Sequence, residues 1–255
     1  MIKLKNVKFA YPGADPLLQD VNVTFPRGKV TTILGPNGSG KSTLLKLASH
    51  LLTATEGEVL LEEQDIKTMK RKAVAGKISM LSQSHQPPEL EVGELVSFGR
   101  YPYKKYGQSL SKEDEYYIEE AMKKVDITQY RHRMVNKLSG GERQRAYIAM
   151  ALAQNTEMIV LDEPTTYLDI HIRYELMDLI RELNQQGKSI VMVLHDLDLA
   201  LKYSDYLILM EEGKIVTTGS PKELVASGEI ERVFRIKIRL LENEKEVFYC
   251  FSKKA

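Results

Sequence analysis

Residues 30–52 read VTTILGPNGSGKSTLLKLASHLL, and the character of the sequence changes twice along this stretch. Val30 to Leu34 are apolar or β-branched, which predicts a buried strand. A glycine-rich loop follows from Gly35 to Gly40, and leucines then recur at helical spacing from Leu44 to Leu52. An anion site at the start of a helix requires strand, glycine loop and helix in this order. We therefore expect an α/β fold built around this segment.

The loop matches the pattern G-x-x-x-x-G-K-[ST], which is typical of phosphate-binding loops. Its glycines allow positive φ angles, so several backbone N–H groups can turn inward and form a concave phosphate site. Lys41 would reach the β- and γ-phosphates, and the Ser42 hydroxyl is a hard oxygen ligand suited to Mg²⁺. The competing interpretation is a glycine-rich turn with an incidental lysine, and a kinase or a GTPase would share the motif. The residues expected to bind the nucleotide are Gly35, Pro36, Asn37, Gly38, Ser39, Gly40, Lys41, Ser42 and Thr43.

Composition is that of an ordinary globular protein, and 255 residues suffice for one large domain or a core with a smaller lobe. The 36 Lys and Arg against 35 Asp and Glu leave a formal charge of +1, which argues against a nucleic-acid binder held mainly by phosphate contacts. The single cysteine, Cys250, cannot form an internal disulfide and fits a reducing compartment. Because no run of about 18 uncharged apolar residues occurs, we expect any membrane association to come through a partner.

Strand and helix patterns alternate along the rest of the chain. Further strands are predicted at 21–25, 59–61, 78–81, 158–161, 190–194 and 206–210. A helix at 172–183 separates two of these strands, so we expect a mostly parallel sheet. Residues 87–136 are instead rich in Tyr, Lys and Glu at helical spacing, and Ser111 begins a capping-box pattern. We interpret this region as a helical lobe inserted into the α/β core.

Two adjacent carboxylates, Asp162 and Glu163, end the strand predicted at 158–161. Ligands gather at the carboxyl ends of parallel strands, so this pair is expected beside the phosphate loop. Asp162 would hold Mg²⁺, and Glu163 would polarise the attacking water. The alternative is a solvated acidic pair that opens the turn at Pro164.

Residues 138–145 read LSGGERQR and form the most specific motif of the chain. Ser139 and two glycines open a helix, which creates a second anion-binding helix N-terminus. Here the chain resembles the ABC ATPases, whose signature is LSGGQ or LSGGE followed by a basic helix. The resemblance implies that this segment contacts the γ-phosphate held by a second copy, so that two nucleotides are sandwiched in a head-to-tail dimer. The implied contact residues are Ser139, Gly140, Gly141 and Glu142. The alternative is a helix N-cap whose glycines permit close packing.

Four further positions match the ABC pattern in order along the chain. The resemblance implies that Tyr11 stacks on adenine and that Gln83 contacts Mg²⁺ or the attacking water. It also implies that Asp169 lies at the dimer seam, and that His195 hydrogen-bonds the γ-phosphate. A core tyrosine and a structural histidine are the simpler interpretations of Tyr11 and His195.

The resemblance covers the chain to about residue 225 and implies a phosphate-loop NTPase core with a mostly parallel sheet. An N-terminal antiparallel β subdomain and an inserted α-helical subdomain would complete this fold. We expect the core at 1–86, the helical subdomain at 87–137, the signature helix and second core part at 138–225, and a C-terminal extension at 226–255. The implied cofactors are ATP and Mg²⁺. The implied partners are a second copy, polytopic permease subunits and, indirectly, an extracytoplasmic substrate-binding protein, with this chain on the cytoplasmic face of the membrane.

Two segments resemble the importers of iron–siderophore, haem and cobalamin. Residues 166–170 read TYLDI where SALD is commoner in the family, and residues 96–102 read VSFGRYP. Arg100 and its tyrosine neighbours would line the groove for the permease, or else begin a solvated helix. A soluble ABC ATPase of the iron–sulfur assembly or translation type is the alternative function. A small-molecule kinase would leave the signature segment and His195 unexplained.

Overall fold

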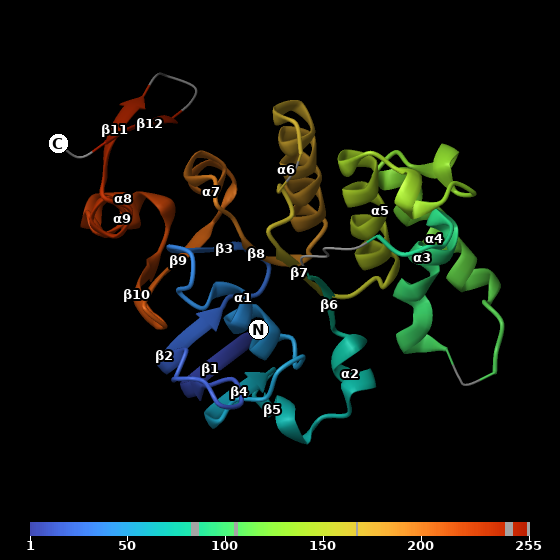
Figure 1. The fold of residues 1–255 in the computed structure, drawn as a ribbon, viewed down its shortest axis with the longest axis horizontal. Helices are drawn as coiled ribbons and strands as arrows, with labels where there is room; N and C mark the ends of the chain where they lie inside the picture. The colour runs from blue at the N-terminus through green and yellow to red at the C-terminus, as the bar shows by residue number, and fades with distance from the viewer. Residues whose placement is uncertain (83–86, 105–106, 167, 243–246, 254–255) are drawn as a thin grey trace. The chain divides into compact units, whose positions relative to one another are not determined.

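The computed structural model describes residues 1–82, 87–104, 107–166, 168–242 and 247–253 (Figure 1). The chain forms two compact units, of which one combines residues 1–69 with 189–255 and the other comprises residues 70–188. Within the described residues, no helix combines the length and the apolar character needed to cross a membrane. The finer boundaries expected at 86/87, 137/138 and 225/226 stay predictions.

The first unit begins with an antiparallel sheet, as the sequence predicted for its N-terminal part. Its strands are β1 (Ile2–Phe9), β2 (Leu18–Phe25), β4 (Glu56–Leu61) and β5 (Gln64–Asp65), in the order β2-β1-β4-β5. Leu4 of β1 faces Val23 of β2 on one side and Val59 of β4 on the other. Alternate residues of these strands are buried, because only one face of the sheet is turned to the core. The short η1 (Ile66–Thr68) follows β5.

Parallel strands form the centre of the first unit. They are β3 (Val30–Leu34), β8 (Ser189–Val193) and β9 (Tyr206–Glu211), and β10 (Lys214–Gly219) joins β9 in antiparallel fashion. β3 pairs in parallel with both β8 and β9. All residues of β3 and β8 are buried, which agrees with their mainly apolar and β-branched character. Helices α1 (Lys41–Ala48) and α7 (Leu197–Tyr203) follow β3 and β8.

The same unit ends in α8 (Pro221–Ser227), α9 (Glu229–Phe234) and the hairpin of β11 (Ile236–Glu242) and β12 (Val247–Lys253). Pro221 occupies the start of α8, where its fixed φ angle and missing N–H suit the first turn of a helix. Cys250 lies in β12 and is exposed.

The second unit contains a parallel strand pair and most of the helices. The strands are β6 (Ile78–Leu81) and β7 (Met158–Asp162), whose register pairs Leu81 with Leu161. The helices are α2 (Arg71–Ala75), α3 (Val92–Ser97), α4 (Lys112–Lys124), α5 (Gly140–Ala153) and α6 (Ile170–Gln185), with the 3₁₀ turns η2 (Phe98–Tyr103), η3 (Thr128–Tyr130) and η4 (Val135–Lys137). α3, α4 and α5 pack on one another, which confirms the expected helical region. Ser111 caps α4 together with Asp114, as the capping-box pattern predicted.

Arg100 anchors this helical region from inside. Its Nε donates to Asp114 Oδ1 at 2.9 Å, and its Nη1 donates to the Ala153 carbonyl at 2.9 Å. The guanidinium lies 4.2 Å from the ring centre of Tyr103 and 4.4 Å from that of Tyr117. Its side chain is only 5% exposed, so the interpretation of Arg100 as a solvated helix start is wrong. These contacts bind it to three parts of its own unit, and the expected place of Arg100 and its tyrosine neighbours in a groove for the permease stays a prediction.

Candidate functional site

The phosphate loop in the first unit takes a conformation that favours glycine. Gly38 and Gly40 have φ angles of +81° and +94°, and Gly40 is the N-cap of α1. A Cβ built on Gly35 would lie 2.3 Å from the Met210 backbone oxygen, so only glycine fits between the loop and β9. The loop therefore holds the backbone close to β9 and turns into α1, as an anion site at a helix N-terminus requires.

Lys41 and Ser39 show how this loop would receive a triphosphate. Lys41 is 6% exposed, and its Nζ donates to the carbonyls of Gly35 at 2.8 Å and Pro36 at 2.9 Å. These carbonyls hold the ammonium group within the loop. The Ser39 side chain is 3% exposed, and its Oγ has no hydrogen-bond partner among the described residues. A buried hydroxyl normally has a partner, and a phosphate oxygen would supply one, so this loop fits the expected ligand.

Tyr11 lies beside the loop, where the predicted adenine contact requires it. Its hydroxyl is 3.3 Å from Thr43 Oγ1, and its ring meets Phe9 edge-on with centroids 4.9 Å apart. The residue is 40% exposed. It is therefore tethered at its edge and its hydroxyl while part of the ring stays accessible for stacking. Ser42, also in α1, is half-buried.

His195 is exposed and lies between the end of β8 and the start of α7. β3 and β8 are parallel neighbours, so His195 and Gly35 follow the carboxyl ends of adjacent strands. That placement agrees with the expected contact to a phosphate bound at the loop.

The acidic pair lies in the second unit at the end of β7. Asp162 is 4% exposed, and Glu163 has a φ angle of +53°, which is uncommon for a residue with a side chain. The Thr166 N–H donates to the Glu163 carbonyl at 3.3 Å, and the Thr166 hydroxyl donates to Glu163 Oε2 at 3.3 Å. Strained backbone persists only where its surroundings hold it, and here Thr166 holds both the backbone and the carboxylate of Glu163.

The signature segment begins α5 with a capping box. Ser139 Oγ accepts from the Glu142 N–H at 3.3 Å, and Glu142 Oε2 accepts from the Ser139 N–H at 2.8 Å. The Ser139 N–H bond, and then the Tyr130 hydroxyl, lower the pKa of Glu142 from its usual value. Glu142 was expected to contact nucleotide, but its carboxylate is turned back onto its own helix. Ser139 itself is exposed at the helix N-terminus and half-buried Gly140 and Gly141 follow it.

The structure brings the remaining predicted residues together only in part. Asp169 is exposed and directly precedes α6, and Leu168 lies against Gly141, where an added Cβ would be 3.9 Å from Leu168 Cδ2. Gln83 lies outside the described residues. One contact was not predicted: Gln144 Nε2 donates to the Pro164 carbonyl at 2.9 Å. Nothing in the local sequence pattern distinguishes Gln144, because its acceptor lies on a distant segment.

Comparison with known proteins agrees with these motifs. The model of the ABC transporter family matches residues 18–166. The petrobactin import ATP-binding protein FpuC of Bacillus anthracis is 41% identical over 251 residues, which cover 98% of this chain and 92% of that protein. The ferric enterobactin transport ATP-binding protein FepC of Escherichia coli is 42% identical over 233 residues, 91% of this chain and 86% of that protein.

Solved structures share the fold. The dimeric structure of MJ0796, a bacterial ABC transporter cassette, has a TM-score of 0.77 at 31% identity and covers 87% of this chain and 99% of its own. An inward-facing metal-chelate type ABC transporter has a TM-score of 0.83, with 98% of this chain and 96% of that chain covered. At 23% identity, the second likeness concerns the fold alone.

Proposed function

This chain belongs to the ABC transporter family, whose ATP-binding cassettes hydrolyse ATP, and we propose that it powers an importer of iron–siderophore complexes or related metal chelates. The observation that carries the proposal is that one chain has two separate helix N-termini suited to binding a phosphate. One is the loop of Lys41 with its unpartnered Ser39 hydroxyl, and the other is the Ser139 N-terminus of α5. One triphosphate requires only one such site, so the second would serve a nucleotide held by another copy.

In this proposal, the phosphate loop and three residues outside it would bind MgATP together. The loop amides and Lys41 would bind the β- and γ-phosphates, and Tyr11 would stack on the adenine. Ser42 and Asp162, with Gln83, would hold Mg²⁺, which neutralises charge on the phosphate oxygens when bound. The buried position of Asp162 at the end of β7 suits this role, since a buried carboxylate needs a cation or hydrogen bonds.

Glu163 would act as the general base. Its carboxylate would accept a proton from the attacking water while His195 hydrogen-bonds the γ-phosphate. The held backbone of Glu163 supports this role, because a base must be fixed within hydrogen-bond reach of the proton that it removes.

ATP would act first as the link between two copies. Each nucleotide would gain contacts from the second copy's signature segment, so binding shifts the population toward the closed head-to-tail dimer. Asp169 would lie at the seam of this dimer. Hydrolysis would remove the bridging phosphate and reopen the dimer, and the attached permease subunits would follow this cycle.

Cargo and location rest on the relatives. Their printed names describe ATP-binding proteins for petrobactin import and ferric enterobactin transport. We infer that this chain binds permease subunits at the cytoplasmic face of a membrane, in a system with an extracytoplasmic binding protein. ATP-driven uptake of ferric siderophores by the assembled system, with cobalamin and haem as competitors, tests the cargo.

Replacing Glu163 with Gln tests the assignment directly. The variant should bind ATP, lose at least about 100-fold in turnover, since general bases typically contribute 10²–10⁴-fold, and accumulate as an ATP-dependent dimer in size-exclusion chromatography with light scattering. Glu113→Gln, an exposed carboxylate in the first turn of α4, is the matched control and should turn over and elute like the unmodified protein. Retained turnover in Glu163→Gln would show that another group is the base. Loss of turnover without any ATP-dependent dimer would contradict the proposal that two copies share each nucleotide site.

A further inference from the structure

Side chains from two helices hold the described part of the turn between β7 and α6, residues 163–166 and 168–169. Gln144 of α5 donates from Nε2 to the Pro164 carbonyl at 2.9 Å. Arg173 of α6 donates from Nε to the Leu168 carbonyl at 2.8 Å. The two bonds reach this turn near its two ends. Gln144 therefore holds the Pro164 carbonyl, in the residue directly after Glu163, which is proposed as the base.

Gln144 belongs to the same helix as the signature segment. Ser139 caps α5, and Gln144 lies in the first turns of that helix. The first turn also packs on this linking turn, because an added Cβ on Gly141 would lie 3.9 Å from Leu168. A displacement of the Ser139 end of α5 would therefore reach the linking turn at two places: at Pro164 through the Gln144 hydrogen bond, and at Leu168 through the packing of Gly141.

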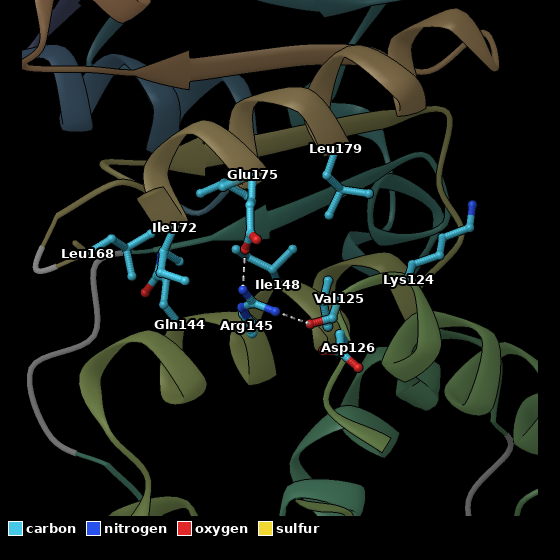
Figure 2. A pocket seen from close by; sticks show the side chains of 11 residues that line it. Lys124, Val125, Asp126, Gln144, Arg145, Ile148, Leu168, Ile172, Glu175 and Leu179 are labelled. Carbon is cyan, nitrogen blue, oxygen red and sulfur yellow. Dashed lines mark hydrogen bonds and ion pairs between the residues drawn. The ribbon is translucent and has the colours of Figure 1, made fainter. Parts of the chain in front are cut away.

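A cavity beside Gln144 is also lined by Arg145 and Glu175, which form a second link between the helices (Figure 2). The cavity has a volume of about 260 Å³, and Gln144, Leu168 and Ile172 line one end of it. Along the same wall, Arg145 pairs with Glu175 of α6 and donates to the Val125 carbonyl at 3.3 Å. Arg145 thus joins helix to helix, whereas Gln144 joins α5 to the turn that carries Glu163.

We propose that Gln144 is a positioning residue that couples the signature segment of one protomer to the Glu163 base of the same protomer. When Ser139 engages the γ-phosphate held by the second copy, α5 is fixed, and the Gln144 amide sets the orientation of the Pro164–Thr165 peptide, one residue beyond Glu163. ATP bound by the second copy would thereby align the Glu163 base of the first protomer, which acts on the ATP that the first protomer holds. This inference rests on the proposed dimer.

The chemistry of the contact accounts for a glutamine at this position. The Pro164 carbonyl accepts a hydrogen bond, and the Gln144 amide supplies the donor. Gln144→Glu keeps the size and shape of the side chain, but an ionised carboxylate has no hydrogen to donate. Gln144→Lys restores a donor on a flexible chain and serves as the rescue variant.

The test uses the purified full chain. In Gln144→Glu, kcat for ATP hydrolysis should fall about fivefold to tenfold, the loss that corresponds to one hydrogen bond, and the Hill coefficient for ATP should fall toward 1. Affinity for a fluorescent ATP analogue and the thermal midpoint should stay unchanged, and Gln144→Lys should recover at least half of kcat. Glu175→Gln removes the negative charge from the neighbouring Arg145–Glu175 ion pair between α5 and α6 and should leave kcat and the Hill coefficient unchanged.

A second measurement separates positioning from dimer formation. In the Glu163→Gln background, adding Gln144→Glu should leave the ATP concentration at half-dimerisation unchanged within about twofold. Unchanged kcat in Gln144→Glu, an equal loss in Glu175→Gln, or loss of the trapped dimer would each overturn the proposal. A failure of the proposed dimer, in which two copies share each nucleotide site, is detected separately: the Glu163→Gln protein would then never form an ATP-dependent dimer.

Discussion

Replacing Asp114 with Asn removes the negative charge from the buried centre of the helical region while keeping the side chain's shape. The side chains of Asp114 and Arg100 are 10% and 5% exposed, and the Arg100 Nε to Asp114 Oδ1 distance is 2.9 Å. Asp114 also accepts from the Ser111 hydroxyl at 2.7 Å and the Ser111 N–H at 3.0 Å. Asparagine can accept some of these bonds, so the substitution isolates the contribution of the charge.

The pKa of Asp114 gives the magnitude. Burial opposes ionisation and would raise the pKa of this carboxyl, but the bonds from Ser111 and the Arg100 guanidinium outweigh burial and lower the pKa from 3.8 to about 2. A folded-state pKa below the unfolded value means that ionisation stabilises the fold above the unfolded pKa. This shift corresponds to about 2 kcal/mol near neutral pH. The contribution is lost as pH falls through the folded pKa, and roughly half of it has gone by about pH 3.

Urea unfolding of both proteins at several pH values measures this contribution. We expect Asp114→Asn to lower the free energy of unfolding by about 2 kcal/mol at pH 7, and the difference to shrink to about 1 kcal/mol near pH 3. The exposed Glu113→Gln on the same helical turn should change it by less than about 0.5 kcal/mol at either pH. A difference for Asp114→Asn that does not depend on pH would refute the argument, because it would not come from the charge.

Two further substitutions test the nucleotide contacts. Gly35→Ala would place a Cβ 2.3 Å from the Met210 backbone oxygen and should abolish measurable binding of a fluorescent ATP analogue. Gly38→Ala has a φ angle of +81° but nothing within 4 Å of the added Cβ, so it should weaken binding of the analogue only about tenfold. Equal effects of the two substitutions would contradict the inference that the loop lies too close to Met210 for any residue but glycine. Glu142→Ala should destabilise the start of α5 by about 1 kcal/mol and lower ATP turnover, whereas Glu142→Gln, which can still accept from the Ser139 N–H, should retain it. Full turnover in Glu142→Ala would show that the capping box does not prepare Ser139.

Local patterns predicted the elements, because their causes lie within a few residues. The apolar run predicted the strand, the glycines predicted the loop, and the leucine spacing predicted the helix at 30–48, and the structure confirms all three. The cap of α4 was equally visible, since Ser111 and Asp114 are three residues apart. A mostly parallel sheet was predicted from the alternation of strands and helices, and the pairing of β6 with β7 is parallel.

Long-range contacts were not predictable in the same way. Arg100 meets Asp114 and the distant Ala153 carbonyl, and no periodicity of the sequence encodes that meeting. The assignment of Glu142 to the nucleotide came from the family resemblance, although the S-x-x-E spacing of 139–142 already contained the capping box that the structure shows. The positive φ of Glu163 has no signal in its residue type, because the neighbouring Thr166 and Gln144 contacts hold it.

Ser139 can cap its own helix and still serve a phosphate because a hydroxyl carries separate donor and acceptor capacity. Its oxygen accepts from the Glu142 N–H, and this bond leaves the hydroxyl hydrogen to be donated elsewhere. Aspartate and asparagine cap helices about as well as serine. Aspartate, however, would set a negative charge against the γ-phosphate. The turned-back Glu142 carboxylate follows the same logic, since it stabilises the Ser139 N–H while its charge stays directed at its own helix rather than at an incoming anion. The residue pair therefore stabilises α5 and keeps its N-terminus able to bind an anion, which is what a site shared between two copies requires.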